Sequence, residues 1–241
     1  GYIPLTEPYS SLSGFEHRSG GGAETIMAPA EVLSVAGENA IVDWVFIELR
    51  DPAKADSVVA TRSGLIQRDG DIVDTDGLSP LLFTRTPEGA YYVAVRHRNH
   101  LATMTADPVD LSAESPIIDF SSHTTDLWNS NPLFDQLEQS EINGKRALWA
   151  GNTNLNRSVV FAGQDNDVDV IFNAIDQAPG NSFFRLQTYI LNGYFKEDVD
   201  LNAKAVYSGQ NNDVDIIFNN IDSHPGNWFR IRTFIIPEQL P

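Results

Sequence analysis

The sequence predicts a protein that is mainly β with a small α part, in which an antiparallel β-sandwich precedes a duplicated loop–helix module. Two observations predict this fold class. Between residues 41 and 106, short β-branched and aromatic runs alternate with turn signals and show no helical period. In the C-terminal part of the chain a segment recurs at an offset of 46, and 17 of 31 aligned positions are identical.

Residues 1–40 are predicted to form an extended N-terminal arm. Pro4 and Pro8 bar this segment from a central strand, and Gly20-Gly21-Gly22 would serve as a hinge. The arm carries more apolar surface than an unpaired tail would leave in water. We therefore expect it to be ordered, with its acceptor either its own domain or another subunit. Its apolar residues are Tyr2, Ile3, Leu5, Tyr9 and Leu12.

The predicted β-sandwich domain spans residues 41–125. Its expected strands are residues 41–50, 57–67, 81–84, 90–96 and 100–105. His97 and His100 would point to opposite faces of a strand, so they would share a metal ion only if the strand breaks between them. Residues 126–147 form a connector, with one short helix expected around residues 134–137.

Residues 148–241 contain the duplication, with repeats at 148–193 and 194–241. Each repeat reads as an Asx-rich loop, a short helix, a Pro-Gly-Asn turn and a strand-like tail. The helices are expected to start near Asp165 and Asn211. The cap of the first N–H groups would be Asp165 or Asn166 in the first repeat and Asn211 or Asn212 in the second. Apolar residues then follow at i, i+3, i+4 and i+7, which predicts two equal helices that pack about a pseudo-twofold axis. These residues are Val168, Ile171, Phe172 and Ile175, and Val214, Ile217, Phe218 and Ile221.

The Asx-rich loops predict calcium sites. Side-chain oxygens at positions 1, 3 and 5 of a tight loop, together with a carboxylate that opens the next helix, match the hard oxygen ligands that calcium prefers. The second loop is the better site because it carries more negative charge, whereas Asx residues that only form turns and caps are the alternative. The second set is Asp198, Asp200, Asn202 and Asp213, and the weaker first set is Asn152, Asn154, Asn156 and Asp167.

Charge and cysteine content exclude several classes of function. Asp and Glu outnumber Lys and Arg by 33 to 16, which gives a formal net charge of −17. Such a chain repels phosphate, so we expect no nucleic-acid partner, and the absence of long apolar runs predicts no membrane insertion. The sequence contains no Cys, which removes disulfides and thiolate chemistry.

The two repeats resemble dockerin-type repeats, in a variant whose loop is lengthened by Phe161-Ala-Gly163 and Tyr207-Ser-Gly209. The stretches 42–50, 68–70 and 91–101 resemble a β-rich module of large secreted surface proteins of Bacteroidota. In that family the module often precedes dockerin-like repeats and an end like Glu238-Gln-Leu-Pro241. The resemblance implies an extracellular or cell-surface, calcium-associated, structural or adhesive module, and it implies no catalysis.

These observations together predict a non-enzymatic extracellular structural module. We expect it to self-assemble as a filament or surface layer, or to anchor a larger cell-surface assembly. A homo-oligomer or polymer would form through the N-terminal arm or through edge strands, which pair by main-chain hydrogen bonds. Two alternatives stay open: a calcium-dependent, dockerin-like module that docks on a separate receptor, and an accessory part of a secreted hydrolase.

Overall fold

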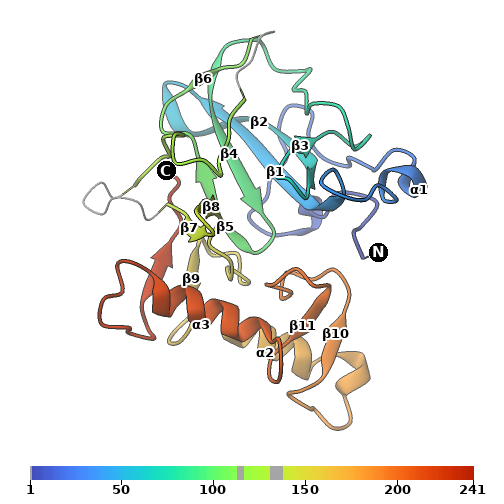
Figure 1. Cartoon of the computed structure of the whole chain (residues 1–241), viewed down its shortest axis with the longest axis vertical. Coiled ribbons are helices and arrows are strands. Elements are labelled where there is room, and N and C mark those ends of the chain that lie inside the picture. The colour runs from blue at the N-terminus through green and yellow to red at the C-terminus, as the bar shows by residue number, and fades with distance from the viewer. Residues whose placement is uncertain (1, 113–116, 131–137) are drawn as a thin grey trace.

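A computed structural model describes residues 2–112, 117–130 and 138–241 (Figure 1). The protein is mainly β, with 29% of its residues in strands and 13% in helices, and its sheets are antiparallel. The helix expected around residues 134–137 falls outside the described residues. No helix in the described ranges is both long and apolar enough to cross a membrane.

The sheet domain contains six strands in the order β3-β2-β1-β4-β5, and β6 also pairs with β4. Four of the five predicted strands are confirmed. Residues 81–84 are not a strand, because Pro80 has no N–H with which to extend the single bridge from Val73. The strands are β1 (Ile41–Asp51), β2 (Lys54–Gln67), β3 (Ile72–Val73), β4 (Ala90–His97), β5 (His100–Met104) and β6 (Val109–Asp110).

Both faces of this sheet are buried, yet a second packed sheet is not found among the described residues, so the sandwich is not confirmed. Successive side chains of β1 point to opposite faces. Trp44 and Phe46 lie in a cluster with arm residues, whereas Val45, Ile47 and Leu49 lie in a different cluster. Irregular segments cover the second face, where they contribute partly buried residues such as Leu81, Phe83, Leu111, Ile118 and Phe120.

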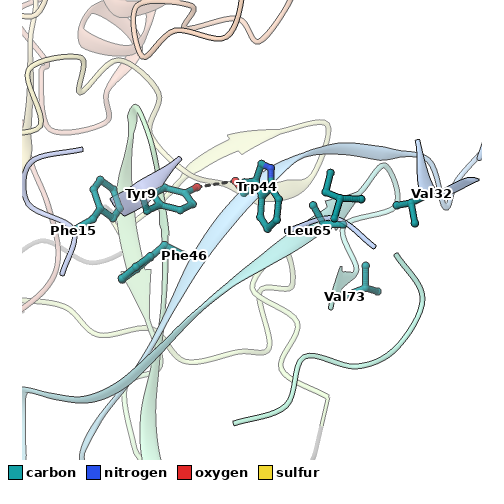
Figure 2. Packing of buried hydrophobic residues seen from close by; sticks show 8 residues of the cluster. Tyr9, Phe15, Val32, Trp44, Phe46, Leu65 and Val73 are labelled. Atoms are coloured by element: carbon teal, nitrogen blue, oxygen red, sulfur yellow. Dashed lines mark hydrogen bonds between the residues drawn. The ribbon is translucent and has the colours of Figure 1, made fainter. Parts of the chain in front are cut away.

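The N-terminal arm is ordered and lies on its own sheet. It contains two short helical turns, η1 (Tyr9–Ser11) and α1 (Pro29–Val32). Tyr9 and Phe15 are buried against Phe46, and the Tyr9 hydroxyl donates to the Trp44 carbonyl at 2.7 Å (Figure 2). The predicted glycine hinge is instead a close contact. A Cβ on Gly21 would lie 2.3 Å from the Thr61 carbonyl oxygen, so only glycine fits there.

A short hairpin of β7 (Ser140–Ile142) and β8 (Lys145–Ala147) leads into the two repeats, which exchange their tails. The tail of the first repeat pairs with the loop strand of the second, and the reverse also holds, at equivalent positions. The first repeat contains β9 (Ser158–Val160), α2 (Val168–Asp176), η2 (Pro179–Asn181) and β10 (Ile190–Asn192), and the second contains β11 (Lys204–Val206), α3 (Asp213–Ser223) and β12 (Ile235–Pro237).

The side chains between the repeats are also reciprocal. The Phe172 ring lies 5.1 Å from that of Tyr207, and the Phe218 ring lies 5.2 Å from that of Phe161. These two pairs are equivalent at the offset of 46. The expected pseudo-twofold packing of α2 and α3 is therefore confirmed.

Both helices begin two to three residues later than expected. Asp165 and Asn211 have φ values of 54° and 55°, a left-handed conformation outside the α-helical region, so they precede the helices. The next residues are the caps, since the side-chain oxygens of Asn166 and Asn212 accept from the backbone N–H groups of Asp169 and Asp215.

The C-terminal residues return to the sheet domain and cover its β5 edge. The N–H of Leu101 donates to the Trp149 carbonyl, and the N–H of Ala102 donates to the Glu238 carboxylate at 3.0 Å. Leu240 is buried beside Met104 of β5. In a single chain the β5 edge is thus already occupied, which removes it as a free pairing surface.

Candidate metal centre

The second loop is organised around Asp213, the fully buried first residue of α3. One of its carboxylate oxygens accepts from the N–H of Val199 at 2.5 Å and from that of Asp200 at 3.3 Å. The other oxygen accepts from Val206 of β11 at 2.7 Å. A single carboxylate therefore connects the start of the loop, its strand and its helix.

The other predicted ligands converge on the same point. Asp198 and Asp200 both accept from the N–H of Asn202, at 3.0 and 3.2 Å. Asp198 also accepts from the N–H of Ala203, whereas the Asn202 amide donates to Asp200. The loop thus folds back on itself as the 1, 3, 5 spacing predicts.

The carboxylates of Asp198, Asp200 and Asp213 have oxygens that all lie within 4.8 Å of one another. Calcium–oxygen bonds measure about 2.3–2.6 Å, so two ligands on opposite sides of one ion are about 5 Å apart. Burial raises the pKa of Asp213 to about 7, and the charge of Asp200 adds to this shift. Burial also raises the pKa of Asp198. A divalent cation would offset this concentration of negative charge, so the donor set fits calcium.

The first loop has the same hydrogen bonds but less charge. Asp167 accepts from Asn154 and Val160, as Asp213 does from Asp200 and Val206. The side chains of Asn152 and Asn154 accept from the N–H of Asn156, at 3.1 and 3.0 Å. Burial raises the pKa of Asp167 to about 6. The structure thus brings Asn152, Asn154 and Asp167 together, whereas the side-chain oxygen of Asn156 accepts from Ser158. The three Asn side chains are neutral.

The sixth position of each loop has a left-handed backbone. Arg157 has φ of 70° and Ala203 has φ of 67°, and neither residue is the glycine that such a position favours. Arg157 directs its side chain away from the loop, where it donates to Glu238 at 2.6 Å. The first loop therefore places a cationic residue at this position without bringing its charge among the donors.

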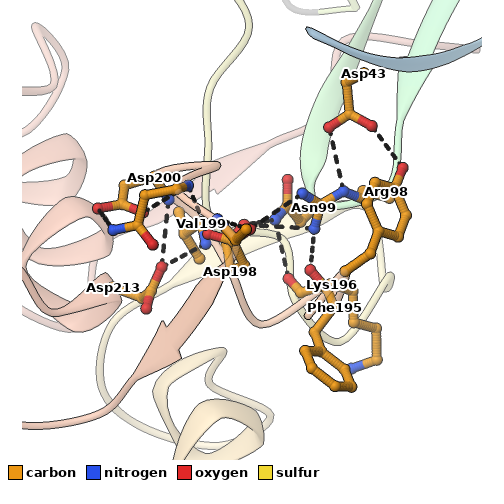
Figure 3. A network of polar contacts seen from close by, with 12 residues as sticks. Asp43, Arg98, Asn99, Phe195, Lys196, Asp198, Val199, Asp200 and Asp213 are labelled. Atoms are coloured by element: carbon orange, nitrogen blue, oxygen red, sulfur yellow. Dashed lines mark hydrogen bonds and ion pairs between the residues drawn. The ribbon is translucent and has the colours of Figure 1, made fainter. Parts of the chain in front are cut away.

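The β4–β5 turn reaches across to the second loop and contacts Asp198, which the sequence did not predict (Figure 3). Arg98 is buried between two aspartates, 3.4 Å from a carboxylate oxygen of Asp43 and 3.5 Å from one of Asp198. The Asn99 amide donates to the carbonyls of Lys196 and Asp198 at 3.0 and 2.7 Å. One predicted ligand is thus held by the sheet domain.

The same cluster contains Tyr194, whose ring lies 4.2 Å from the Arg98 guanidinium carbon and whose hydroxyl donates to Asp43 at 2.6 Å. Burial alone would raise the pKa of Asp43, but the charges of His97 and Arg98 hold it well below its usual range. Burial would also lower the pKa of Arg98, which Asp43 more than offsets. The guanidinium therefore stays charged between the two domains.

In a continuous strand the side chains of His97 and His100 would point to opposite faces. The chain turns between them instead, because β4 ends at His97 and β5 begins at His100. Their Nδ1 atoms lie 2.9 Å apart, and Nε2 of His97 lies 3.1 Å from Asp43. Burial lowers the pKa of His100 far below its usual value, so its imidazole is neutral, and its Nδ1 also lies 2.8 Å from the side-chain oxygen of Asn99. The pair supports the turn that carries Arg98.

A second group of titratable residues lies within the N-terminal arm and was not predicted. Glu7, His17 and Glu24 have ligand atoms within 4.8 Å of one another. Both carboxylates already accept hydrogen bonds: Glu7 from the N–H groups of Tyr9, Ser10 and Ala23, and Glu24 from Arg62 and two backbone N–H groups. This group fastens the arm to β2. No short sequence pattern predicts it, because its members are separated by loops.

No protein-family model, curated protein or solved structure matches this chain.

Proposed function

We propose that this chain is a non-enzymatic structural module of the cell exterior that self-associates, with a calcium ion stabilising its second dockerin-like repeat. The observation that carries self-association is a pair of exposed aromatic tips. Phe183 and Phe184 follow α2 and are 86% and 73% exposed, and Trp228 and Phe229 follow α3 and are 86% and 87% exposed.

The backbone at the base of each tip is held by hydrogen bonds to a buried Asn side chain. In the first repeat the buried Asn181 accepts from the N–H of Leu186 and donates to two carbonyls, and Asn227 does the same around Ile231. A rigid loop that presents large aromatic side chains to water has the character of a binding hot spot, because little conformational entropy remains to be lost.

Self-association is tested by sedimentation velocity and electron microscopy of the purified chain over a concentration series. We expect oligomers that increase with concentration. These oligomers should disappear when all four aromatic tip residues are replaced by Ser. These side chains are exposed, so the variant should keep its unfolding midpoint. A wild-type chain that stays monomeric at every concentration up to the solubility limit would contradict the proposal.

The calcium part is tested by titration calorimetry of single variants. Asp200 is exposed, so Asp200→Ala should remove most calcium binding without unfolding the chain. The matched variant Asn154→Ala, at the equivalent position of the first loop, should change binding little. Equal losses in the two variants would overturn the ranking of the loops.

Self-association through the N-terminal arm is a second candidate. The arm already buries Tyr9, Phe15 and Ile26 against its own sheet, so exchange with a neighbour would first have to break these contacts. Docking on a separate receptor is the other candidate, and the doubled tips favour it because they offer two equivalent contact points. A chelator would abolish such docking if the second loop holds its geometry through calcium.

A further inference from the structure

The two repeats differ in the packing at the C-terminal end of their helices, where the first repeat has a groove. A groove of about 480 Å³ opens between α2 with the residues that follow it and the chain from β10 to Glu197. Its apolar lining includes Val170, Ala174, Ala178, Leu191 and Phe195, and Asn173, Gln177 and Glu197 are its polar residues.

The equivalent place on the second repeat is filled by a stack of three rings. The His224 ring lies 5.0 Å from that of Trp149 on one side and 5.0 Å from that of Phe234 on the other. At the offset of 46, Trp149 corresponds to Phe195 and His224 corresponds to Ala178. The first repeat therefore lacks the middle ring, and its groove has room for one aromatic side chain.

We propose that the Trp228–Phe229 tip of a second copy of this chain fills the groove on α2, which joins the copies head to tail. This inference rests on the proposed self-association and specifies its interface. The tip and the groove belong to opposite ends of the duplicated module, since the loop after α3 and the loop after α2 leave at opposite sides (Figure 1). A tip therefore reaches the groove of another copy rather than its own.

Two observations favour this tip over Phe183 and Phe184. Those two rings already pack on each other at 4.7 Å, whereas no ring contact joins Trp228 or Phe229 to another aromatic residue in the described ranges. Arg232, which is exposed, also follows the second tip, whereas the first repeat has Gln187 at the equivalent place. The second tip therefore carries one more positive charge, which favours its approach to another copy of a chain of net charge −17. Glu197 of the groove is nearly buried and already pairs with Lys196 at 2.9 Å, so the contact with the tip rests on the aromatic side chains.

The contact joins two different surfaces, so it is heterologous. Contacts of this kind produce closed rings or open filaments, depending on the rotation between successive copies. In an open filament the copy at one end would present a free tip and the copy at the other end a free groove. The filament could therefore grow from both ends.

The test uses two variants of the full chain in sedimentation velocity. Trp228→Ser with Phe229→Ser removes the tip, and Ala178→His with Ala174→Asn fills the groove with the residues of the second repeat. Each variant alone should raise the concentration for half-association at least about 30-fold, as expected for a hot spot of about 2 kcal/mol. Ala174→Glu is a second groove variant, for use if the double substitution lowers the unfolding midpoint.

An equimolar mixture of the tip variant and the groove variant should form only a 1:1 dimer, because one intact tip meets one intact groove. The matched control Phe183→Ser with Phe184→Ser should assemble as the wild type does. If the wild type assembles but the mixture stays monomeric, or if the control loses assembly instead, the interface is wrong although self-association stands. A monomeric wild type would overturn both.

Discussion

At the scale of single residues, the chain concentrates its chemistry in buried carboxylates. The Asp213 carboxylate accepts three backbone hydrogen bonds, and that of Asp167 accepts two backbone hydrogen bonds and one from the Thr153 hydroxyl, yet burial still raises the pKa of both. A carboxylate in this setting favours its protonated form unless a cation lies nearby. The same residue that organises each loop is therefore the one that connects loop stability to pH and to metal.

The pH dependence of stability should show this directly. Asp213 has a pKa of about 7 in the folded chain and an ordinary value of 3.8. Between these values the folded state binds more protons than the unfolded state, so metal-free stability should fall as the pH rises from about 4 to about 7. Calcium should restore stability most above pH 7, where Asp213 is ionised.

The measurement is the unfolding midpoint against pH, in chelator and in calcium. Asp213→Asn should reduce the fall of the unfolding midpoint between pH 4 and 7 and remove its increase by calcium. The fall that results from ionisation of Asp167 should remain. An unchanged pH profile in this variant would contradict the assignment.

At the scale of elements, the N-terminal arm acts as part of the hydrophobic core. Tyr9 is fully buried, and its hydroxyl bond to Trp44 joins the arm to β1. Without the arm, the fully buried Trp44 and Phe46 would be exposed on one face of the sheet. Deletion of residues 1–22 is therefore expected to destabilise the sheet, in contrast to the free hinge that the three glycines predict.

Substitution of Tyr9 measures this role. Tyr9→Phe should cost about 1–2 kcal/mol of unfolding free energy through the lost buried hydrogen bond. Tyr9→Ala should cost about 3–5 kcal/mol, as other large-to-small core substitutions do. Urea unfolding gives both values, with Tyr2→Ala as the control because Tyr2 is half exposed. Equal costs at Tyr9 and Tyr2 would mean that the arm leaves its sheet in solution.

At the scale of the whole molecule, one cation joins the sheet domain to the repeats. Arg98 contacts Asp43 of β1 and Asp198 of the second loop, and all three side chains are buried. Removing one member of a buried ion network is costly because the charges that remain have no partner. Substitution of Arg98 should therefore weaken the coupling between the sheet and the repeats, which Leu101 and Leu240 also join through buried apolar contacts.

Arg98→Ala should destabilise the chain by about 3–5 kcal/mol and split one calorimetric unfolding transition into two. Arg185→Ala is the control, since this exposed arginine also pairs with an aspartate but should cost at most about 1 kcal/mol. One sharp transition at an unchanged midpoint in Arg98→Ala would show that the domains do not depend on this junction.

Much of the fold follows from local pattern. The alternation in β1 and β4, the apolar period of α2 and α3, and the Asx caps depend on residues within a few positions of one another, and the sequence predicts each of them. The duplication adds the pseudo-twofold axis, because two equal apolar faces bury one another. The Asx-rich loops belong here too, since three of the four residues in each set lie within five consecutive positions.

The tertiary structure alone decides what lies far apart in the chain. Tyr194 reaches Asp43 across 151 positions, and Arg98 reaches Asp198 across 100. No local pattern encodes these contacts, because each needs two surfaces that form only after both domains fold. The same reason hides the groove at Ala178: the sequence shows alanine opposite His224, but only the packed repeats show that a ring is missing there.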